Sequence, residues 1–426
     1  MELPPKVNVC ECWARDGIQG EDHFVPTEKK IAMINRMAEI GIKRIEVTSF
    51  AHPKLVTQFA DSIEVLKGIS RHKDVTYIAI VPNDKAFDRL LDACDKGYGV
   101  QEITAIISAS EDHLLANLEK TFTEAMPPLA SLVRRARAAG LSVIGCIGTS
   151  FGCPLAGEVP IEKVYELTEW YLEQGATSIM LGDTTGEANP LQVSQFYARM
   201  KERFPKVDFI SHFHDTRGMG LANTFAALQQ GIVYHDCSFG SIGGQPATKR
   251  PKYHKGFSGN TCTEDMIVMM NEMGIQTGLK DEDVIQTALL AENMLGKEAN
   301  GHVTRSGIVR HRSREVLNGN SLYAGMKIFP GILLLTPETI KEKPGLKLPE
   351  LAIRKALEKS GPLPEKLTFD LDKVNVRGSL NERVILVTRF KVAAVLNHGE
   401  RAVLEVLSQK SDGQVYLDGV LTIAFS

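Results

Sequence analysis

The feature that most constrains the fold is an alternation of strand-like and helix-like segments over the first part of the chain. Eight apolar or β-branched runs, each about one strand long, occur at 7–13, 44–50, 75–82, 102–109, 141–149, 178–183, 208–214 and 233–242. The segments between them have apolar residues at helical spacing, as at 28–40 and 161–174. Eight such units predict an α/β fold, a parallel TIM (β/α)8 barrel, which typically takes about 250 residues. A doubly wound open sheet is the alternative, but no G-x-G-x-x-G motif follows the first run.

Length and charge limit the classes of protein that remain. A chain of 426 residues suits one large domain followed by a smaller one. The formal net charge of −3 gives no electrostatic case for a nucleic-acid partner. No apolar run approaches the roughly 18 residues of a membrane span, and Met1–Pro5 lacks the basic and apolar regions of a signal peptide. We therefore expect a cytoplasmic protein that binds neither nucleic acid nor membrane.

The spacing of the cysteines does not indicate a disulfide framework. The seven cysteines contain no C-x-x-C pair, and several lie in strand-like runs. This pattern predicts reduced, mostly buried thiols. Cys10 and Cys12 could form a ligand pair, but alternation along a buried strand is the better explanation of their spacing.

Two histidines close the seventh strand-like run. His212 and His214 stand at i and i+2, so on a strand they point the same way. Neutral imidazole is a common ligand of divalent metals. For an isolated H-x-H motif, however, chance placement is about as good an explanation as a metal site.

Polar residues at the other strand ends favour the metal site. The active site of a TIM barrel lies at the carboxyl ends of its strands. In at least six of the eight units polar or ionisable residues stand there, including Arg15, Asp16, Glu46, Asn83, Ser108, Asp183 and the two histidines. Each has a structural explanation alone, since Asp16 and Asp183 could cap the following segments and Glu46 could pair with an arginine. Their coincidence on one rim predicts a metal and carboxylate site.

The residue types indicate which metal this site would take. One carboxylate (Asp16), two imidazoles (His212 and His214) and one amide oxygen, for which Asn260 is the candidate, leave positions open for water and substrate. Such a centre suits Mg²⁺ or Mn²⁺. Zn²⁺ is less well suited because no thiolate stands at the rim. Arg15 would place a permanent cation beside the metal, where it can stabilise an enolate oxygen.

These segments carry a family resemblance. The segments 15–19, 45–50, 152–154, 181–184, 212–216, 221–224, 258–260 and 263–265 resemble the 3-hydroxy-3-methylglutaryl-CoA lyases of the DRE-TIM metallolyase family, over about residues 6 to 300. The resemblance implies a divalent metal and a retro-aldol, Claisen-type cleavage of a 3-hydroxyacyl-CoA to acetyl-CoA and a keto acid. It also implies that Asp16, His212, His214 and Asn260 hold the metal, that Arg15 steadies the enolate, and that Glu46 and Asp183 are the rim carboxylates.

One position departs from the family pattern. The lyases carry a catalytic acid/base cysteine in a G-G-C-P pattern, whereas this chain reads Gly243-Gly244-Gln245-Pro246. An amide has no proton to give at neutral pH. The loop from Gln245 to Asn260 is also longer than in the family. We expect His254 or Tyr253 of that loop, or else a metal-bound water, to supply the proton, and His254 is the better donor near neutrality.

The remaining chain predicts a second domain. We expect the barrel domain at 1–312, a connector at 313–345 and a β-rich domain at 346–426, with one helix at 349–359. Strand-like runs follow at 366–376, 383–396, 402–407 and 414–425, and the run 405–425 resembles the last two strands of a hot-dog fold. This domain could pair subunits, cover the barrel mouth or bind acyl-CoA.

Three functions compete at this point. The first is a metal-dependent lyase that acts on an acyl-CoA, in a homodimer or higher homo-oligomer. The second is a related synthase that condenses acetyl-CoA with a 2-keto acid. Such synthases typically have an H-x-H-N-D motif, whereas this chain has His212-Phe213-His214-Asp215-Thr216, which favours the lyase. The third is a non-catalytic relative, against which the retained Arg15 and Asp16 argue.

Overall fold

The computed structural model describes residues 3–245, 258–309, 327–335, 347–358, 367–377, 384–396, 401–410 and 412–425. The chain divides into two compact units, Met1–Ile308 and Val309–Ser426. Within the described ranges no helix has the length and apolar character needed to cross a bilayer.

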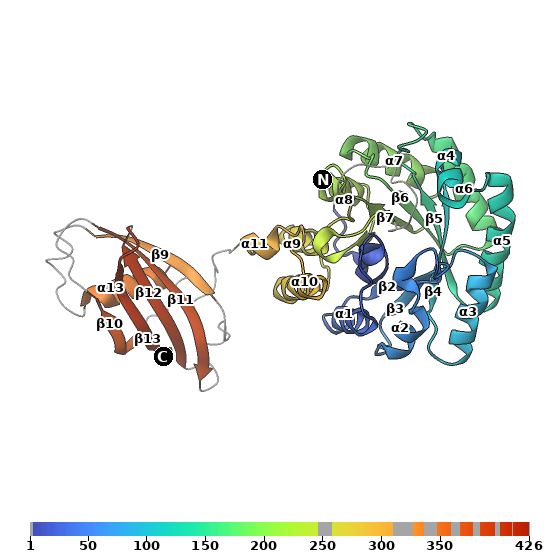
Figure 1. Ribbon diagram of the computed structural model, residues 1–426. Coiled ribbons are helices and arrows are strands. Elements are labelled where there is room, and N and C mark those ends of the chain that lie inside the picture. The colour runs from blue at the N-terminus through green and yellow to red at the C-terminus, as the bar shows by residue number, and fades with distance from the viewer. Residues whose placement is uncertain are drawn as a thin grey trace. The chain divides into compact units, whose positions relative to one another are not determined.

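The first unit is a closed barrel of eight parallel strands (Figure 1). The strands are β1 (Asn8–Glu11), β2 (Arg44–Ser49), β3 (Thr76–Ile80), β4 (Glu102–Ser108), β5 (Ser142–Gly148), β6 (Ser178–Asp183), β7 (Phe209–Phe213) and β8 (Tyr234–Cys237). Each strand pairs with the next along the chain, and β1 pairs with β8 to close the sheet. All carboxyl ends therefore lie at the same end of the barrel.

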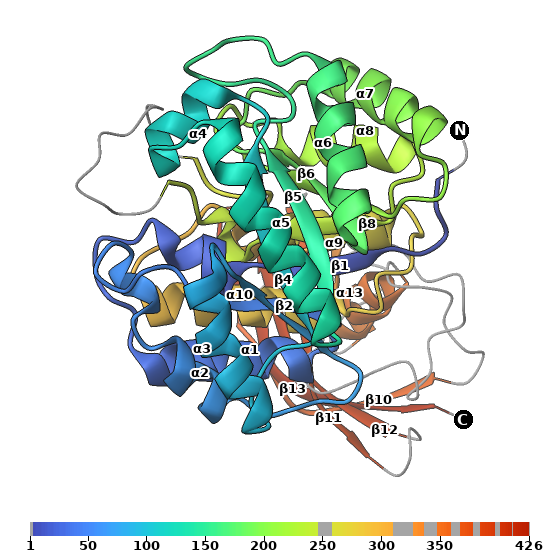
Figure 2. The ribbon, with the colours of Figure 1, turned by 90° about the vertical axis from the view of Figure 1, so that its right-hand side faces the viewer.

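Helices surround these strands (Figure 2). They are α1 (Thr27–Glu39), α2 (Ser62–Gly68), α3 (Asp84–Asp95), α4 (Glu111–Leu118), α5 (Phe122–Ala138), α6 (Ile161–Gln174), α7 (Pro190–Arg203), α8 (Gly220–Gln229), α9 (Thr263–Glu272), α10 (Asp281–Leu295) and α11 (Val303–Ser306). Short turns lie at η1 (Trp13–Gly17), η2 (Thr57–Phe59) and η3 (Phe239–Ser241). The large buried cluster of the unit packs these helices against the strands.

The barrel confirms the predicted fold class, and each of its strands lies within a predicted run. Two runs were predicted too long. The first enters the π-helical turn η1 at Trp13, and the last ends at Cys237. Gly240 follows with a left-handed backbone (φ 70°), which only glycine adopts without cost and which turns the chain out of the strand direction.

A smaller buried cluster fills the inside of the barrel. Its members come from strands and loops around the barrel and are Cys10, Cys12, Ile78, Ile144, Cys146, Met180 and Ile210. The alternation of side chains along each strand explains why these residues face inward while their neighbours face the helices. The interior is therefore packed and contains three thiols.

In its described residues the second unit is a five-stranded antiparallel sheet with one helix (Figure 1). The chain order is β9 (Lys327–Leu335), α13 (Lys347–Leu357), β10 (Leu367–Val376), β11 (Val384–Leu396), β12 (Arg401–Lys410) and β13 (Val415–Phe425), and the spatial order is β10-β13-β12-β11-β9. Ile353 and Leu357 of α13 share a buried cluster with inward residues of β11, β12 and β13. The helix therefore packs against the sheet, and the likeness of the run 405–425 to a hot-dog fold stays a prediction.

One part of this unit differs from the predicted connector at 313–345. Residues Lys327–Leu335 are strand β9, which pairs with β11 at the edge of the sheet. Pro330 and Gly331 in that run favoured a connector, because proline lacks the N–H that a central strand must donate. An edge strand tolerates proline, and the pairing register shifts opposite it, between Thr388 and Phe390.

Candidate metal centre

Arg15 and Asp16 lie on the π-helical turn η1, directly after β1. The Cys12 carbonyl accepts hydrogen bonds from the backbone N–H groups of both Arg15 and Gly17, and this tight turn directs the two side chains into the barrel mouth. A β-carbon at Gly17 would lie 2.7 Å from the Ser238 hydroxyl, so the turn also requires a residue without a side chain.

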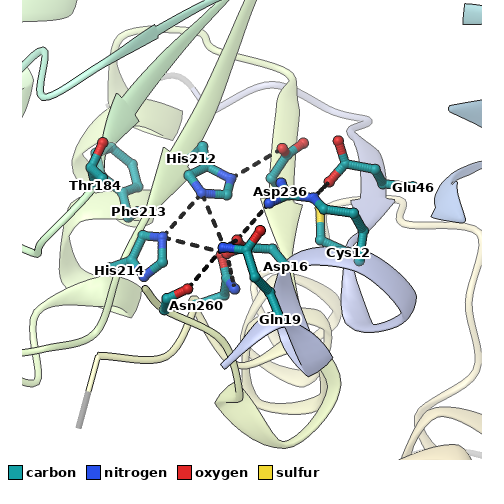
Figure 3. Close-up of polar contacts among 12 residues, drawn as sticks. Cys12, Asp16, Gln19, Glu46, Thr184, His212, Phe213, His214, Asp236 and Asn260 are labelled. Carbon is teal, nitrogen blue, oxygen red and sulfur yellow. Dashed lines mark hydrogen bonds and ion pairs between the residues drawn. The ribbon is translucent and has the colours of Figure 1, made fainter. Parts of the chain in front are cut away.

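The two imidazoles converge on the Asp16 carboxylate (Figure 3). His212 Nδ1 lies 3.2 Å from Asp236 Oδ2, and His214 Nδ1 lies 2.9 Å from the Ser258 carbonyl oxygen. Both partners are acceptors, so each Nδ1 carries the hydrogen and each Nε2 presents a lone pair. The two Nε2 atoms are 3.2 Å apart, at 3.9 Å and 3.5 Å from Asp16 Oδ2.

Asn260 completes the cluster from the loop beyond β8. Its Nδ2 donates to Asp16 Oδ2 at 2.6 Å and to the Ile242 carbonyl at 3.0 Å. Its Oδ1 is buried and has no hydrogen-bond partner in the described part of the chain. Gly243 makes this approach possible, because its φ of +137° is unfavourable for other residues and a β-carbon there would overlap Asn260 Nδ2.

This donor set fits a divalent cation. The ligand atoms of Asp16, His212 and His214 lie within 4.8 Å of one another, and all three residues are buried. Two facing nitrogen lone pairs and an orphaned amide oxygen cost free energy unless a proton or a cation lies between them. One carboxylate oxygen, two imidazoles and one amide oxygen suit an oxygen- and nitrogen-binding metal with open positions.

Electrostatics keep most of these ligands ready for a metal. Burial raises the pKa of Asp16, but Arg15 and the two histidines outweigh burial and lower the pKa to about 2. Burial lowers the pKa of His214 to about 4. Burial also lowers the pKa of His212, but the hydrogen bond to Asp236 outweighs it and raises the pKa above its ordinary value. A proton on His212 is therefore the one that a metal would have to displace.

Two carboxylates, those of Asp16 and Glu46, hold the Arg15 guanidinium. Its Nη1 donates to Asp16 Oδ1 at 2.6 Å, and its Nε donates to Glu46 Oε2. Nη2 makes no hydrogen bond within the described residues, and Arg15 lines the pocket beside the ligands. Glu46 also accepts from Thr104 at 3.3 Å. Glu46 thus orients Arg15 and is not itself among the clustered ligands.

Two predicted site residues are not placed with the metal cluster. Asp183 is buried at the end of β6, and its carboxylate accepts from the backbone N–H groups of Glu187 and Ala188 at 2.7 Å and 3.2 Å. Burial raises the pKa of Asp183 to about 7. The carboxylate therefore shapes the turn whose Thr184 and Thr185 line the pocket. His254, and Tyr253 with it, lie outside the described residues, whereas Gln245 lines the pocket.

The structure adds one residue that sequence reasoning missed, Asp236. The parallel register sets it beside His212 on β7 and beside Cys10 on β1. An aspartate inside the apolar run at 233–242 was the available signal, since a buried carboxylate needs a partner. A carboxylate that holds the second nitrogen of a metal-binding histidine fixes its tautomer and its orientation.

The fold and the ligand cluster define a TIM-barrel protein with a candidate divalent-metal centre at its carboxyl-terminal rim. The HMGL-like family model matches residues 6–290, so the chain belongs to the HMGL-like family. Hydroxymethylglutaryl-CoA lyase YngG of Bacillus subtilis (strain 168) is 41% identical over 297 residues, which are 70% of this chain and 96% of that protein. The mitochondrial hydroxymethylglutaryl-CoA lyase of Bos taurus is 35% identical over 304 residues, 71% of this chain and 90% of that protein.

Solved structures agree with these relatives. The crystal structure of the Bacillus subtilis HMG-CoA lyase matches with a TM-score of 0.67 and 39% identity, over 72% of this chain and 99% of that chain. An HMG-CoA lyase from Acinetobacter baumannii in complex with coenzyme A and 3-methylmalate matches with a TM-score of 0.66 and 34% identity, over 72% and 97%. The resemblance predicted from the sequence motifs is confirmed, and the family match ends before the second unit begins.

The first prediction concerns the metal ligands. Mn²⁺ should bind at about one ion per chain. Asp16→Asn or His214→Ala should each abolish this binding, because either change removes a direct metal ligand from a site that has few. Calorimetric titration of metal-free protein measures the stoichiometry. His302→Ala is the matched control, since that imidazole is exposed and pairs with Asp265 outside the cluster. Unchanged stoichiometry in either ligand variant would remove that residue from the metal site.

Proposed function

We propose that the protein is a metal-dependent carbon–carbon lyase. It cleaves a 3-hydroxy-3-substituted acyl-CoA, similar to hydroxymethylglutaryl-CoA, to acetyl-CoA and a keto acid in a retro-aldol, Claisen-type reaction. The observation that carries this proposal is the cluster of Asp16, His212, His214 and Asn260 with Arg15 fixed beside it. The relatives named hydroxymethylglutaryl-CoA lyase support the substrate class.

The residues have distinct parts in this reaction. Asp16, His212, His214 and Asn260 would hold Mg²⁺ or Mn²⁺, and such an ion, when bound, polarises the C3 hydroxyl and draws negative charge toward itself. Asp236 and the Ser258 carbonyl keep both Nε2 atoms turned toward the metal position. Arg15 Nη2, the arm not used by Asp16 or Glu46, donates to the thioester oxygen as enolate charge develops.

The pocket combines the metal cluster with an apolar lining. Asp16, His212 and His214 line it together with Arg15, Gly244 and Gln245. Its apolar residues include Val56, Ile80, Ile106, Leu114 and Leu118, which suit the acyl part of a thioester. Arg15 is the only lysine or arginine among the described lining residues, so the charged part of the substrate belongs beside Arg15 and the metal ligands.

The second prediction is the outcome of a lyase assay, which tests the proposal directly. The purified protein should cleave at least one member of a panel of 3-hydroxy-3-substituted acyl-CoAs in the presence of Mg²⁺ or Mn²⁺, with acetyl-CoA and the keto acid followed by mass spectrometry. Chelation should stop the reaction. Condensation of acetyl-CoA with 2-keto acids, without any cleavage, would favour the synthase instead. Absence of both reactions would favour a non-catalytic relative.

The third prediction concerns Arg15. Arg15→Lys should lower turnover by roughly 10²–10³-fold, because a lysine cannot contact Asp16, Glu46 and the substrate oxygen together, and one preorganised oxyanion contact is typically worth that factor. Arg44→Lys is the matched control, since Arg44 pairs with Glu102 at the start of β2 and does not line the pocket. Near-normal turnover of Arg15→Lys would make Arg15 a structural residue.

The fourth prediction concerns the proton donor. We assign protonation of the enolate to His254, because the side-chain amide of Gln245 lines the pocket where the family has a cysteine and has no proton to give. His254→Ala should lower turnover and remove the alkaline limb of its pH profile, where the wild-type imidazole loses the proton that it donates, while Tyr253→Phe should leave both unchanged. An unchanged rate and profile in His254→Ala would favour a water as donor. Cleavage of hydroxymethylglutaryl-CoA gained by Gln245→Cys would indicate a different native acyl-CoA.

A further inference from the structure

A second group of metal-binding side chains lies inside the barrel. Cys10 Sγ, Cys12 Sγ and a carboxylate oxygen of Asp236 all lie within 4.8 Å of one another, and the three residues are buried. Cys10 and Cys12 are two residues apart and project from one face of β1 and its end, into the interior cluster. Asp236 is the register partner of Cys10 on β8. Sequence spacing supplied only the two thiols, and the fold supplies the third ligand.

One carboxylate oxygen of this group has no hydrogen-bond partner among the described residues. Asp236 Oδ2 accepts from His212, but Asp236 Oδ1 is buried without a hydrogen-bond partner among the described residues. An unpaired carboxylate oxygen in a packed interior is costly and calls for a compensating group. Both thiol sulfurs lie within 4.8 Å of a carboxylate oxygen of Asp236, and Cys12 Sγ also makes a long contact, 3.9 Å, with the Cys10 carbonyl.

The interior holds both thiols in the protonated form when no metal is bound. The hydrogen bond from Cys12 lowers the pKa of Cys10, but burial and the charge of Asp236 outweigh it and raise the pKa to about 11. The hydrogen bond to Cys10 and burial raise the pKa of Cys12 well above its ordinary value. A cation that enters must therefore displace two protons, after which two thiolates and one carboxylate surround it.

We propose that Cys10, Cys12 and Asp236 form a second, soft-metal site for Zn²⁺ or a similar thiophilic cation. Two thiolates select such ions over Mg²⁺ and Mn²⁺, which prefer oxygen ligands. Three protein ligands leave one position of a tetrahedron open. This chemistry differs from that of the rim cluster, which has no thiol, so the two sites sort hard and soft cations.

Asp236 would join the two sites. One of its oxygens accepts from His212 Nδ1, and the other is the one left for the thiol site. Figure 3 shows Cys12 and Asp236 on the side of His212 away from His214. A metal held through Asp236 would fix that carboxylate and, through it, the orientation of a rim ligand.

Titration with Co²⁺ tests the site without relying on catalysis. Metal-free, reduced full-length protein should bind about two Co²⁺ per chain, one of which produces the near-ultraviolet charge-transfer absorption of a thiolate–Co²⁺ bond. Mg²⁺ should bind at about one ion per chain without that band. Cys10→Val and Cys12→Val, which keep apolar packing, should each lose the band and one equivalent of Co²⁺. Asp16→Asn should lose the other equivalent and keep the band.

The matched control is Cys146→Val, a change at a third buried thiol of the same interior cluster, which is outside the three-ligand group. It should keep both the band and the stoichiometry. A wild-type protein without the charge-transfer band overturns the proposal, whatever the variants do. A band that survives in both Cys10→Val and Cys12→Val also overturns it, because the thiolate would then come from elsewhere.

Discussion

The site is organised by the convergence of buried hydrogen-bond acceptors on one point. Each imidazole has its Nδ1 hydrogen committed, to Asp236 in one case and to the Ser258 carbonyl in the other, so both Nε2 lone pairs face the Asp16 carboxylate. Such an arrangement is unfavourable by itself, because like-signed partial charges are held together away from water. A divalent cation bound there would remove the conflict. It would also link the turn after β1, the end of β7 and the loop beyond β8, in addition to the hydrogen bonds from Asn260 to Asp16 and to the Ile242 carbonyl.

Arg15 shows how the same region tolerates further buried charge. A lone guanidinium in this interior would be costly, but its arms reach Asp16 and Glu46, and each carboxylate in turn needs that cation. Burial lowers the pKa of Arg15, yet these two carboxylates outweigh burial and raise it above its ordinary value. Pairing therefore gives a charged, oriented donor at the pocket wall.

Most of the barrel could be predicted from the sequence, because buried parallel strands appear as apolar runs and helices as periodic segments. The i, i+2 spacing of His212 and His214 also sufficed to place both on one face. Side-chain direction beyond a strand end was not predictable in the same way. Asp183 follows the same rim rule as Asp16, but the turn after β6 folds back so that backbone N–H groups capture its carboxylate.

Contacts between residues on different strands could not be predicted from the sequence either. Asp236 meets His212 and Cys10 only because the closed barrel brings β7, β8 and β1 into register, and no local spacing encodes that meeting. The edge strand β9 was not predicted because its place in the sheet is also set by pairing between distant segments. Pro330 weakens the strand pattern and is acceptable only at an edge of the sheet.

The edges of the second unit's sheet have a consequence for solubility. An exposed strand edge is a template on which another chain can add a strand and begin to aggregate. Here β9 carries Pro330 and a register shift, and the opposite edge strand, β10, has its own irregularity between Asp370 and Lys373, with charged residues around it. These irregularities interrupt the free backbone donors and acceptors along both edges. Strand addition is therefore disfavoured at the interruptions.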